Sequence, residues 1–356
     1  MNYKMATKAD RNEIYSFKND YSEGAHPNIL KALLETNLQQ QLGYGEDEYC
    51  LRAMELLKEK MQNTDVDIHF VSGGTQANLI VIASVLRPFE SVIAASTGHI
   101  NVHETGAIEA TGHKVNTVDT CDGKLTPAAI RTVLNQHTDE HMVKPRLVYI
   151  SNTTEIGTVY NRTELEELHS FCKANKLLLF LDGARLGSAL AALKEELTLA
   201  DLSRLVDAFY IGGTKNGALI GEAIVLCNEE IKDSFRFNMK QRGALLAKGR
   251  LLGLQFLELF KDNLFLELAQ RANSLAAKLT SGIKEQGYEL LTDSTSNQVF
   301  PIFPDKIIEE LHKKYAFYLW SRMDENSSSV RLVTSWATDE AAVDAFIRDL
   351  GDLTRK

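Results

Sequence analysis

The chain has 356 residues, of which 44% are hydrophobic, with 22 glycines and only 6 prolines, so it is too apolar for a disordered protein and long enough for one large domain and a smaller one. Its 39 Lys and Arg residues against 48 Asp and Glu give a net charge of −9 without long blocks of one sign, which disfavours a nucleic-acid binder. No apolar stretch is long enough to span a membrane, and residues 1–15 lack the apolar core of a secretion signal.

The cysteines are far apart in the sequence and form neither a CxxC pair nor a dense disulfide pattern. Such spacing is typical of proteins from a reducing compartment, so we expect a cytoplasmic protein. The four residues are Cys50, Cys121, Cys172 and Cys227.

Short apolar runs alternate with longer segments of helical period between about residues 68 and 226, which predicts an α/β domain with parallel strands covered by helices. Most runs are apolar at every position, as strands buried on both faces are. Residues 163–166, Thr-Glu-Leu-Glu, predict a capping box at the start of a helix. The expected strands are 68–71, 92–95, 147–151, 177–182, 208–212 and 223–226.

The pattern changes after residue 245 and predicts a second, smaller α/β domain. A long amphipathic helix is expected over 253–287, and a closing helix over 339–350. We therefore place a large domain at 1–245, including the N-terminal segment, and a small C-terminal domain at 246–356. The strands expected in the small domain are 298–303, 316–320 and 330–335.

Polar segments directly follow three of the expected strands, at 72–75, 182–185 and 213–215. The carboxyl ends of parallel strands share one edge of a sheet, where open α/β folds bind their ligands. The three segments are therefore expected to face a common site.

Each segment has a chemical and a purely structural interpretation. The Gly-Gly-Thr at 73–75 precedes a predicted helix and could bind a phosphate, or could simply be a turn. Asp182 could pair with a cationic ring nitrogen, or could cap a helix and pair with Arg185. Lys215 could be an amine nucleophile or an ordinary solvated lysine. Together they match what pyridoxal phosphate requires: a phosphate site, an acid for the pyridine nitrogen and a lysine for covalent attachment.

With these motifs in place, the chain resembles the threonine aldolases of the β-eliminating lyase group, in particular the low-specificity L-threonine aldolases, along nearly its whole length. These are fold type I pyridoxal-phosphate enzymes. The resemblance implies a mostly parallel seven-stranded sheet in the large domain. The matching stretches are FKNDY (17–21), GYGED (43–47), SGGTQAN (72–78), TGHINVHETGA (97–107), SNTTEIG (151–157), LDGAR (181–185), GGTKNGA (212–218) and VRLVTS (330–335).

The resemblance also implies a role for individual residues. Lys215 would attach the cofactor, Asp182 would hold the pyridine nitrogen protonated, and His99 would stack on the ring. The cofactor-binding residues would be Gly73, Gly74, Thr75, His99, Asp182, Arg185, Thr214 and Lys215. The substrate would be held by Asn19, Arg185, Arg331 and Tyr44, with Tyr44 entering the site of a neighbouring subunit of a dimer or tetramer.

Two histidines, His99 and His103, are four residues apart and would share one face if 99–111 were helical. No third metal ligand is positioned by the sequence, so no metal is expected, and His103 is instead a candidate for proton transfer. The family commonly has a histidine where this chain has Asn-Thr-Thr-Glu at 152–155, and Thr154 cannot act as a base at neutral pH. The chain departs from the usual residues of the family at three further positions: it has Lys18 and Asn19 where Arg and Ser are more usual, and Ser335 where a histidine is expected.

The implied reaction is the cleavage of L-threonine or L-allo-threonine to glycine and acetaldehyde. Other reactions with the same cofactor remain alternatives: cleavage of phenylserine, β-elimination or transamination. So does a catalytically silent binding protein, although a protein without catalysis has no need to retain Lys215, Asp182, Arg185 and Arg331 together. A dinucleotide enzyme is disfavoured because the GxGxxG fingerprint is missing.

Overall fold

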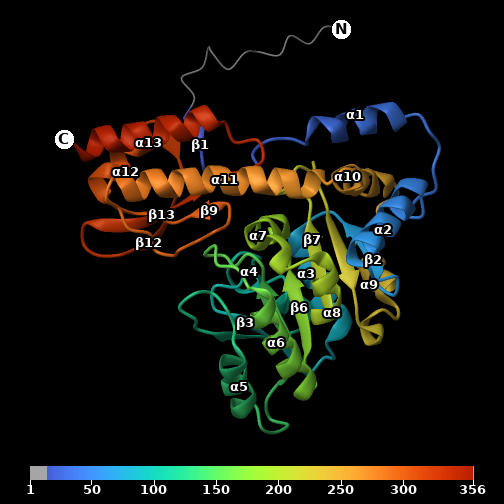
Figure 1. The fold of residues 1–356 in the computed structure, drawn as a ribbon. Coiled ribbons are helices and arrows are strands. Elements are labelled where there is room, and N and C mark those ends of the chain that lie inside the picture. The colour runs from blue at the N-terminus through green and yellow to red at the C-terminus, as the bar shows by residue number, and fades with distance from the viewer. Residues whose placement is uncertain (1–13, 356) are drawn as a thin grey trace.

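The computed structural model describes residues 14–355 and has an α/β architecture with a seven-stranded sheet between two layers of helices (Figure 1). The segment judged to lack a secretion signal lies outside the described residues except for Ile14 and Tyr15. In spatial order the strands are β2 (Asp67–Val71), β8 (Glu222–Leu226), β7 (Ala208–Gly212), β6 (Leu178–Asp182), β5 (Lys144–Ser151), β3 (Glu90–Ala95) and β4 (Val115–Val118).

The predicted mostly parallel sheet is confirmed, with one strand in the opposite direction. β8 pairs antiparallel with both β7 and β2, whereas β7, β6, β5, β3 and β4 are parallel. The prediction that 223–226 is parallel was wrong because the connection 213–221 is too short for a crossover and can only turn the chain back. β4 was missed because its polar Asn116 and Thr117 interrupt the apolar pattern.

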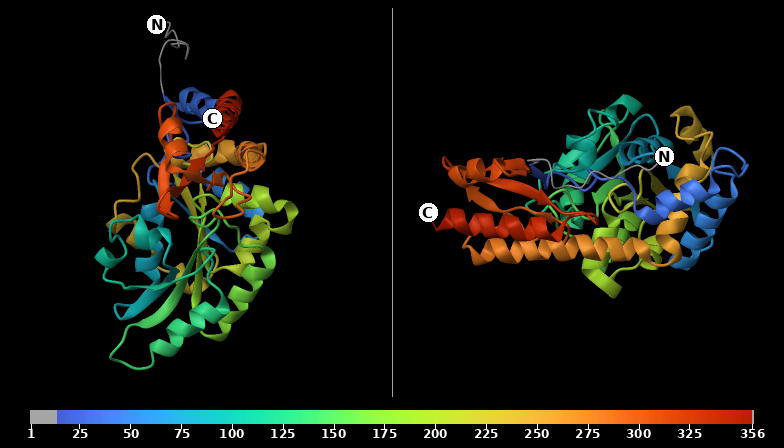
Figure 2. Two further views of the ribbon diagram at one scale, coloured as in Figure 1. Left: turned by 90° about the vertical axis from the view of Figure 1, so that its left-hand side faces the viewer. Right: turned by 90° about the horizontal axis from the view of Figure 1, so that it is seen from above.

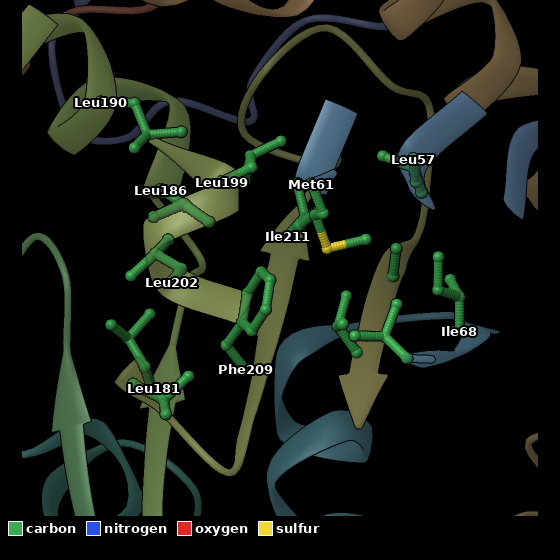
Figure 3. Packing of buried hydrophobic residues seen from close by; sticks show 14 of the residues in the cluster. Leu57, Met61, Ile68, Leu181, Leu186, Leu190, Leu199, Leu202, Phe209 and Ile211 are labelled. Atoms are coloured by element: carbon green, nitrogen blue, oxygen red, sulfur yellow. The ribbon is translucent and has the colours of Figure 1, made fainter. Parts of the chain in front are cut away.

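The strands separate two hydrophobic cores, which explains why their sequences are apolar at nearly every position. In β6, Leu179 and Leu181 enter one core, and Leu178 and Phe180 enter the other. Figure 3 shows the first core, in which sheet residues pack against helix side chains from α2, α7 and α8. The residues labelled there are Leu57, Met61, Ile68, Leu181, Leu186, Leu190, Leu199, Leu202, Phe209 and Ile211.

The helices of this part of the chain connect the strands and cover both faces of the sheet. The predicted helix after residues 73–75 is confirmed. The helices are α1 (Pro27–Thr36), α2 (Glu48–Met61), α3 (Gly74–Val85), α4 (His99–Val102), α5 (Pro127–Gln136), α6 (Arg162–Ala174), α7 (Leu186–Leu193), α8 (Leu199–Leu205) and α9 (Phe235–Gln241).

The capping box of α6 is built by other residues than predicted. The Asn161 side chain accepts from the backbone N–H of Glu164 at 3.0 Å, and the Glu164 carboxylate accepts from the N–H of Asn161 at 2.8 Å. Thr163 lies within the first turn instead. The prediction was wrong because Asn and Thr are both good capping residues, and only the backbone conformation shows which one precedes the first turn.

The C-terminal part begins with two helices rather than the single helix expected over 253–287. α10 (Arg250–Lys261) ends before Asn263, which adopts a left-handed conformation with φ 63°, and α11 (Leu264–Glu285) follows. The expected strand 298–303 is interrupted at Phe300. The remaining elements are β9 (Gln298–Val299), β10 (Ile302–Pro304), α12 (Asp305–His312), β11 (Tyr315–Ala316), β12 (Tyr318–Arg322), β13 (Ser327–Val333) and α13 (Glu340–Thr354).

α10 and the start of α11 pack into the first core, whereas the rest of α11 and the elements after it form a third core, with α13 packed beside α11 over the small sheet (Figure 2). The N-terminal β1 (Tyr15–Ser16) pairs in parallel with β11, and Phe17 is fully buried in this third core. The start of the described chain thus packs with its end. The division at residue 245 stays a prediction. Within residues 14–355, none of the helices is long and apolar enough to cross a membrane.

Candidate active site

A cleft of about 920 Å³ lies at the carboxyl edge of the parallel strands, between the large sheet and β12. The expected convergence is confirmed, because residues from all three polar segments line this one cleft. Two strands of the small sheet contribute the opposite wall. The lining includes Ser72, Gly73, Gly74, Thr75, His99, His103, Glu155, Arg185, Tyr210, Thr214, Lys215, Glu222, Tyr318, Trp320 and Arg331.

Asp182 lies below the cleft at the end of β6, and its carboxylate is fully hydrogen-bonded. Oδ2 accepts from the Tyr149 hydroxyl at 2.6 Å and from Asn78 Nδ2 at 3.0 Å, and Oδ1 accepts from the N–H of Ala184 at 2.9 Å. Burial opposes ionisation, but His99 and these hydrogen bonds hold the pKa of Asp182 below its usual value. Asp182 is therefore a buried anion, as pairing with a protonated ring nitrogen requires.

His99 begins the short helix α4, and its ring is held by a second buried acid. Nδ1 lies 2.7 Å from Glu104 Oε1, which also accepts from Asn78 Nδ2 at 2.7 Å. Asn78 thus connects the carboxylates of Glu104 and Asp182. This network fixes the orientation of the His99 ring above the floor of the cleft.

Lys215 follows β7 and is half-buried in the cleft. Burial lowers its pKa, and the nearby Arg185 lowers it further. Glu222 of β8 faces the same region, and its Oε2 accepts from the backbone N–H of Gly213 at 3.0 Å. Burial raises the pKa of Glu222 to about 8, although the charge of Lys215 opposes this. A lysine of lowered pKa has more of the neutral amine that attacks an aldehyde.

The start of α3 has the features of a phosphate site. Gly73 is the N-cap residue, so no side chain bonds to the first backbone N–H groups of the helix. Gly74 lies so close to Tyr210 that a Cβ on it would be 2.9 Å from the Tyr210 hydroxyl. Thr75 is exposed beside them. The free backbone N–H groups at the start of a helix attract an anion, and glycine lets it come near.

Two arginines line the cleft and have different partners. Arg185 donates to both carboxylate oxygens of buried Asp20, at 2.7 Å from Nε and 3.1 Å from Nη2. The guanidinium of Arg331 lies over the rings of Tyr318 and Trp320, 5.5 and 5.2 Å from their centroids. Its one hydrogen bond within residues 14–355 runs from Nη2 to the carbonyl of Lys18 at 3.5 Å, and its buried Nε has no hydrogen-bond partner there. Burial and the charge of Arg185 lower the pKa of Arg331. An additional anion, such as a substrate carboxylate, would satisfy the unpaired donor.

The structure shows the surroundings of three further predicted residues. His103 lines the cleft, but it caps α4, which ends at Val102, so the helix considered over 99–111 does not form. Asn19 does not line the cleft, since its Oδ1 accepts from Tyr21 and Ser22. Tyr44 is 45% exposed and lies outside the cleft of its own chain, beneath the amino group of Lys240.

Thr154 is directed away from the cleft, and the neighbouring Glu155 lies in it. Thr154 is fully buried, with its hydroxyl 2.7 Å from that of Thr158, whereas Glu155 is among the lining residues. Sequence reasoning missed Glu155, together with Asn78, Glu104, Tyr149, Tyr210 and Glu222. Glu155 had one usable signal, its place next to Thr154 in the stretch where the family commonly has a histidine.

No group of three metal-ligating His, Cys, Asp or Glu side chains occurs in the part of the chain that the structure describes. The residues around the cleft do fit pyridoxal phosphate. The glycine turn at α3 suits its phosphate, the buried Asp182 anion suits its ring nitrogen, and Lys215 suits its aldehyde.

Comparison with known proteins identifies relatives that match nearly the whole chain. A low-specificity L-threonine aldolase from a Pseudomonas species is 35% identical over 94% of this chain and 96% of its own. The structure of Leishmania major threonine aldolase is 50% identical and has a TM-score of 0.94, covering 96% of this chain and 99% of its own. A variant of Thermus thermophilus aspartate aminotransferase shares the fold, with 16% identity, a TM-score of 0.72 and coverage of 96% and 92%. Residues 20–305 match the family model described as β-eliminating lyase, and the chain belongs to this family.

Proposed function

We propose that this protein is a pyridoxal-phosphate-dependent aldehyde lyase that cleaves L-threonine and L-allo-threonine to glycine and acetaldehyde. The observation that carries the proposal is the presence of Lys215, the Asp182 anion and the unpaired donor of Arg331 at one cleft. The Pseudomonas relative matches this chain along nearly its full length and is a low-specificity L-threonine aldolase, which supports the same reaction.

When bound, pyridoxal phosphate supplies the acceptor for the electron pair of the Cα–Cβ bond. Gly73, Gly74, Thr75 and Thr214 are proposed to hold its phosphate. Asp182 keeps a positive charge on the ring nitrogen, which makes electron acceptance favourable, and the neighbouring Tyr149 hydroxyl keeps that carboxylate in place.

The substrate is proposed to bind through its carboxylate to Arg331 and Arg185. Because Asp20 already neutralises Arg185, Arg331 carries most of the uncompensated positive charge. Fixing the carboxylate sets the rotation about Cα and so decides which bond breaks. A clamp of this kind favours the L configuration at Cα.

The direct test is a product assay with the four threonine isomers. We expect glycine and acetaldehyde from both L isomers, with kcat/KM values within about a hundredfold of each other, and no cleavage of the D isomers. Parallel incubations with phenylserine, with serine and with a keto acid distinguish the alternative reactions. Cleavage of a D isomer would contradict the proposed carboxylate clamp.

We also propose that active sites are shared between subunits of a dimer or tetramer. The support is the position of Tyr44, which is exposed on its own chain although its GYGED segment belongs to the family motifs. Mixing inactive Tyr44→Ala and Lys215→Ala proteins under conditions of subunit exchange is then expected to restore part of the activity. A fully active monomer would contradict this arrangement.

The compartment is proposed to be the cytoplasm. All four cysteines are free, which suits a reducing environment. Localisation of the tagged full-length protein tests this.

A further inference from the structure

Two glutamates line the cleft, Glu155 and Glu222, and a third, Glu104, lies behind His99, so the three differ in whether a substrate can reach them. Glu104 is buried with Oε1 bonded to Asn78 and His99, and its Oε2 is buried as well. Glu222 accepts from the backbone of Gly213. Glu155 is half-buried, and one of its carboxylate oxygens remains available.

The Glu155 carboxylate is held by one oxygen only. Oε1 accepts from the Ser151 hydroxyl at 2.7 Å and from the backbone N–H of His99 at 2.9 Å. Within residues 14–355, no other residue donates a hydrogen bond to Oε2. A side chain anchored through one oxygen, with the other oriented by that anchor, has the geometry of a general acid or base.

Burial and a neighbouring carboxylate raise the pKa of Glu155, which favours its protonated form. Burial raises its pKa, hydrogen bonds from Ser151 and His99 oppose this, and the charge of Asp182 raises it further. Other titratable or charged groups that interact with it are Tyr149, Tyr160 and Arg185.

Glu155 is also close to where the reacting hydroxyl is expected. It lines the same cleft as Arg185 and Arg331, the two arginines proposed to hold the carboxylate. In a β-hydroxy-α-amino acid, only Cα and Cβ separate the carboxylate carbon from the hydroxyl oxygen. A base beside the carboxylate site can therefore reach that oxygen directly or through one water.

We propose that Glu155 is the catalytic base that accepts the β-hydroxyl proton during cleavage. The proton moves from the hydroxyl oxygen to Oε2, the O–H electron pair forms the C=O bond of the aldehyde, and the Cα–Cβ pair would be accepted by pyridoxal phosphate when it is bound. In the reverse direction, protonated Glu155 returns the proton to the aldehyde oxygen. This role rests on the proposed function and assigns the base to the residue next to Thr154.

The test compares Glu155→Gln with wild type, with Glu167→Gln on the exposed face of α6 as the matched control. We expect Glu155→Gln to lower kcat for L-threonine at least about a hundredfold with little change in KM, and Glu167→Gln to behave as wild type. Exchange of the Cα proton of glycine, which has no β-hydroxyl, is expected to continue in Glu155→Gln at a rate within a few fold of wild type.

Two measurements that do not depend on catalysis show whether the Glu155→Gln protein remains folded and still binds the cofactor. Its thermal midpoint and its cofactor affinity, measured by visible absorbance, are expected to match wild type. In the apo protein, carbon-13 NMR of labelled glutamate is expected to show raised pKa values for the carboxyls of Glu155 and Glu222, and the Glu155 signal alone is expected to disappear in Glu155→Gln.

The outcomes separate the two proposals. If wild type cleaves threonine and Glu155→Gln cleaves it equally fast, Glu155 is not the base. The same conclusion follows if glycine exchange falls as much as cleavage, or if His103→Asn alone abolishes cleavage while Glu155→Gln does not. If loaded wild type cleaves none of the threonine isomers, the proposed function fails, and the role of Glu155 fails with it.

Discussion

The floor of the cleft and its substrate side differ in how far their polar atoms are already paired. On the floor, Asp182 accepts from Tyr149, Asn78 and the backbone of Ala184, so its position is fixed before any ligand arrives. On the substrate side, the Nε of Arg331 and the Oε2 of Glu155 have no bonding partner from another residue in the part of the chain described. The floor is thus organised for a group that stays bound, whereas the substrate side has polar atoms available for one that comes and goes.

Removing the lysine between these two regions gives the largest expected effect. Lys215→Ala is expected to lower turnover by several orders of magnitude, because the only proposed attachment for the cofactor is lost. Borohydride is expected to fix the cofactor to Lys215 in wild type, as peptide mapping can show. Lys173→Ala, on the surface of α6, is the control and retains activity. Labelling of another lysine would contradict the assignment.

The floor is tested next by neutralising its anion. Asp182→Asn keeps the size of the side chain but removes the charge that stabilises a protonated ring nitrogen. We expect kcat to fall by about 10²–10³-fold, with a smaller change in KM. Steady-state kinetics at saturating cofactor measure this. A change confined to KM would show that Asp182 acts in binding alone.

The substrate side is expected to respond in the opposite way. Arg331→Leu removes the donor left unpaired in the cleft, so KM is expected to rise by about 10–100-fold for every amino acid substrate, with a smaller loss in kcat. Arg331→Lys restores the charge without the planar fork and is expected to recover only part of the affinity. Unchanged KM in Arg331→Leu would exclude this residue from the carboxylate site.

The smallest effect is expected from a single hydrogen bond in the floor. Tyr149→Phe removes one of the donors to Asp182 and is expected to lower kcat less than tenfold and stability by about 1 kcal/mol. Tyr160→Phe is the matched control, because its buried hydroxyl accepts from the N–H of Leu125 instead. Urea unfolding is expected to show that both variants lose a similar amount of unfolding free energy, whereas only Tyr149→Phe is expected to lower kcat.

Much of the large sheet was predictable from the sequence, because strands buried on both faces are apolar at nearly every position. β6 and β7 were located within a residue of their observed bounds for this reason. β4 was not, since an edge strand with Asn116 and Thr117 has no such pattern. The helix break at Asn263 was also hidden, because the apolar period continues on both sides of it.

The sequence by itself determined the residue types of the site and their places after the strands, since motifs such as GGTK and LDGAR are local. Only the tertiary structure decided which side chains enter the cleft. Thr154 and Glu155 are neighbours in the chain, yet one is buried against Thr158 and the other lines the cleft. Likewise, the pairing of Arg185 with Asp20 leaves Arg331 as the arginine with an unpaired donor. Such differences arise from contacts between residues far apart in the sequence, and local patterns contain no information about them.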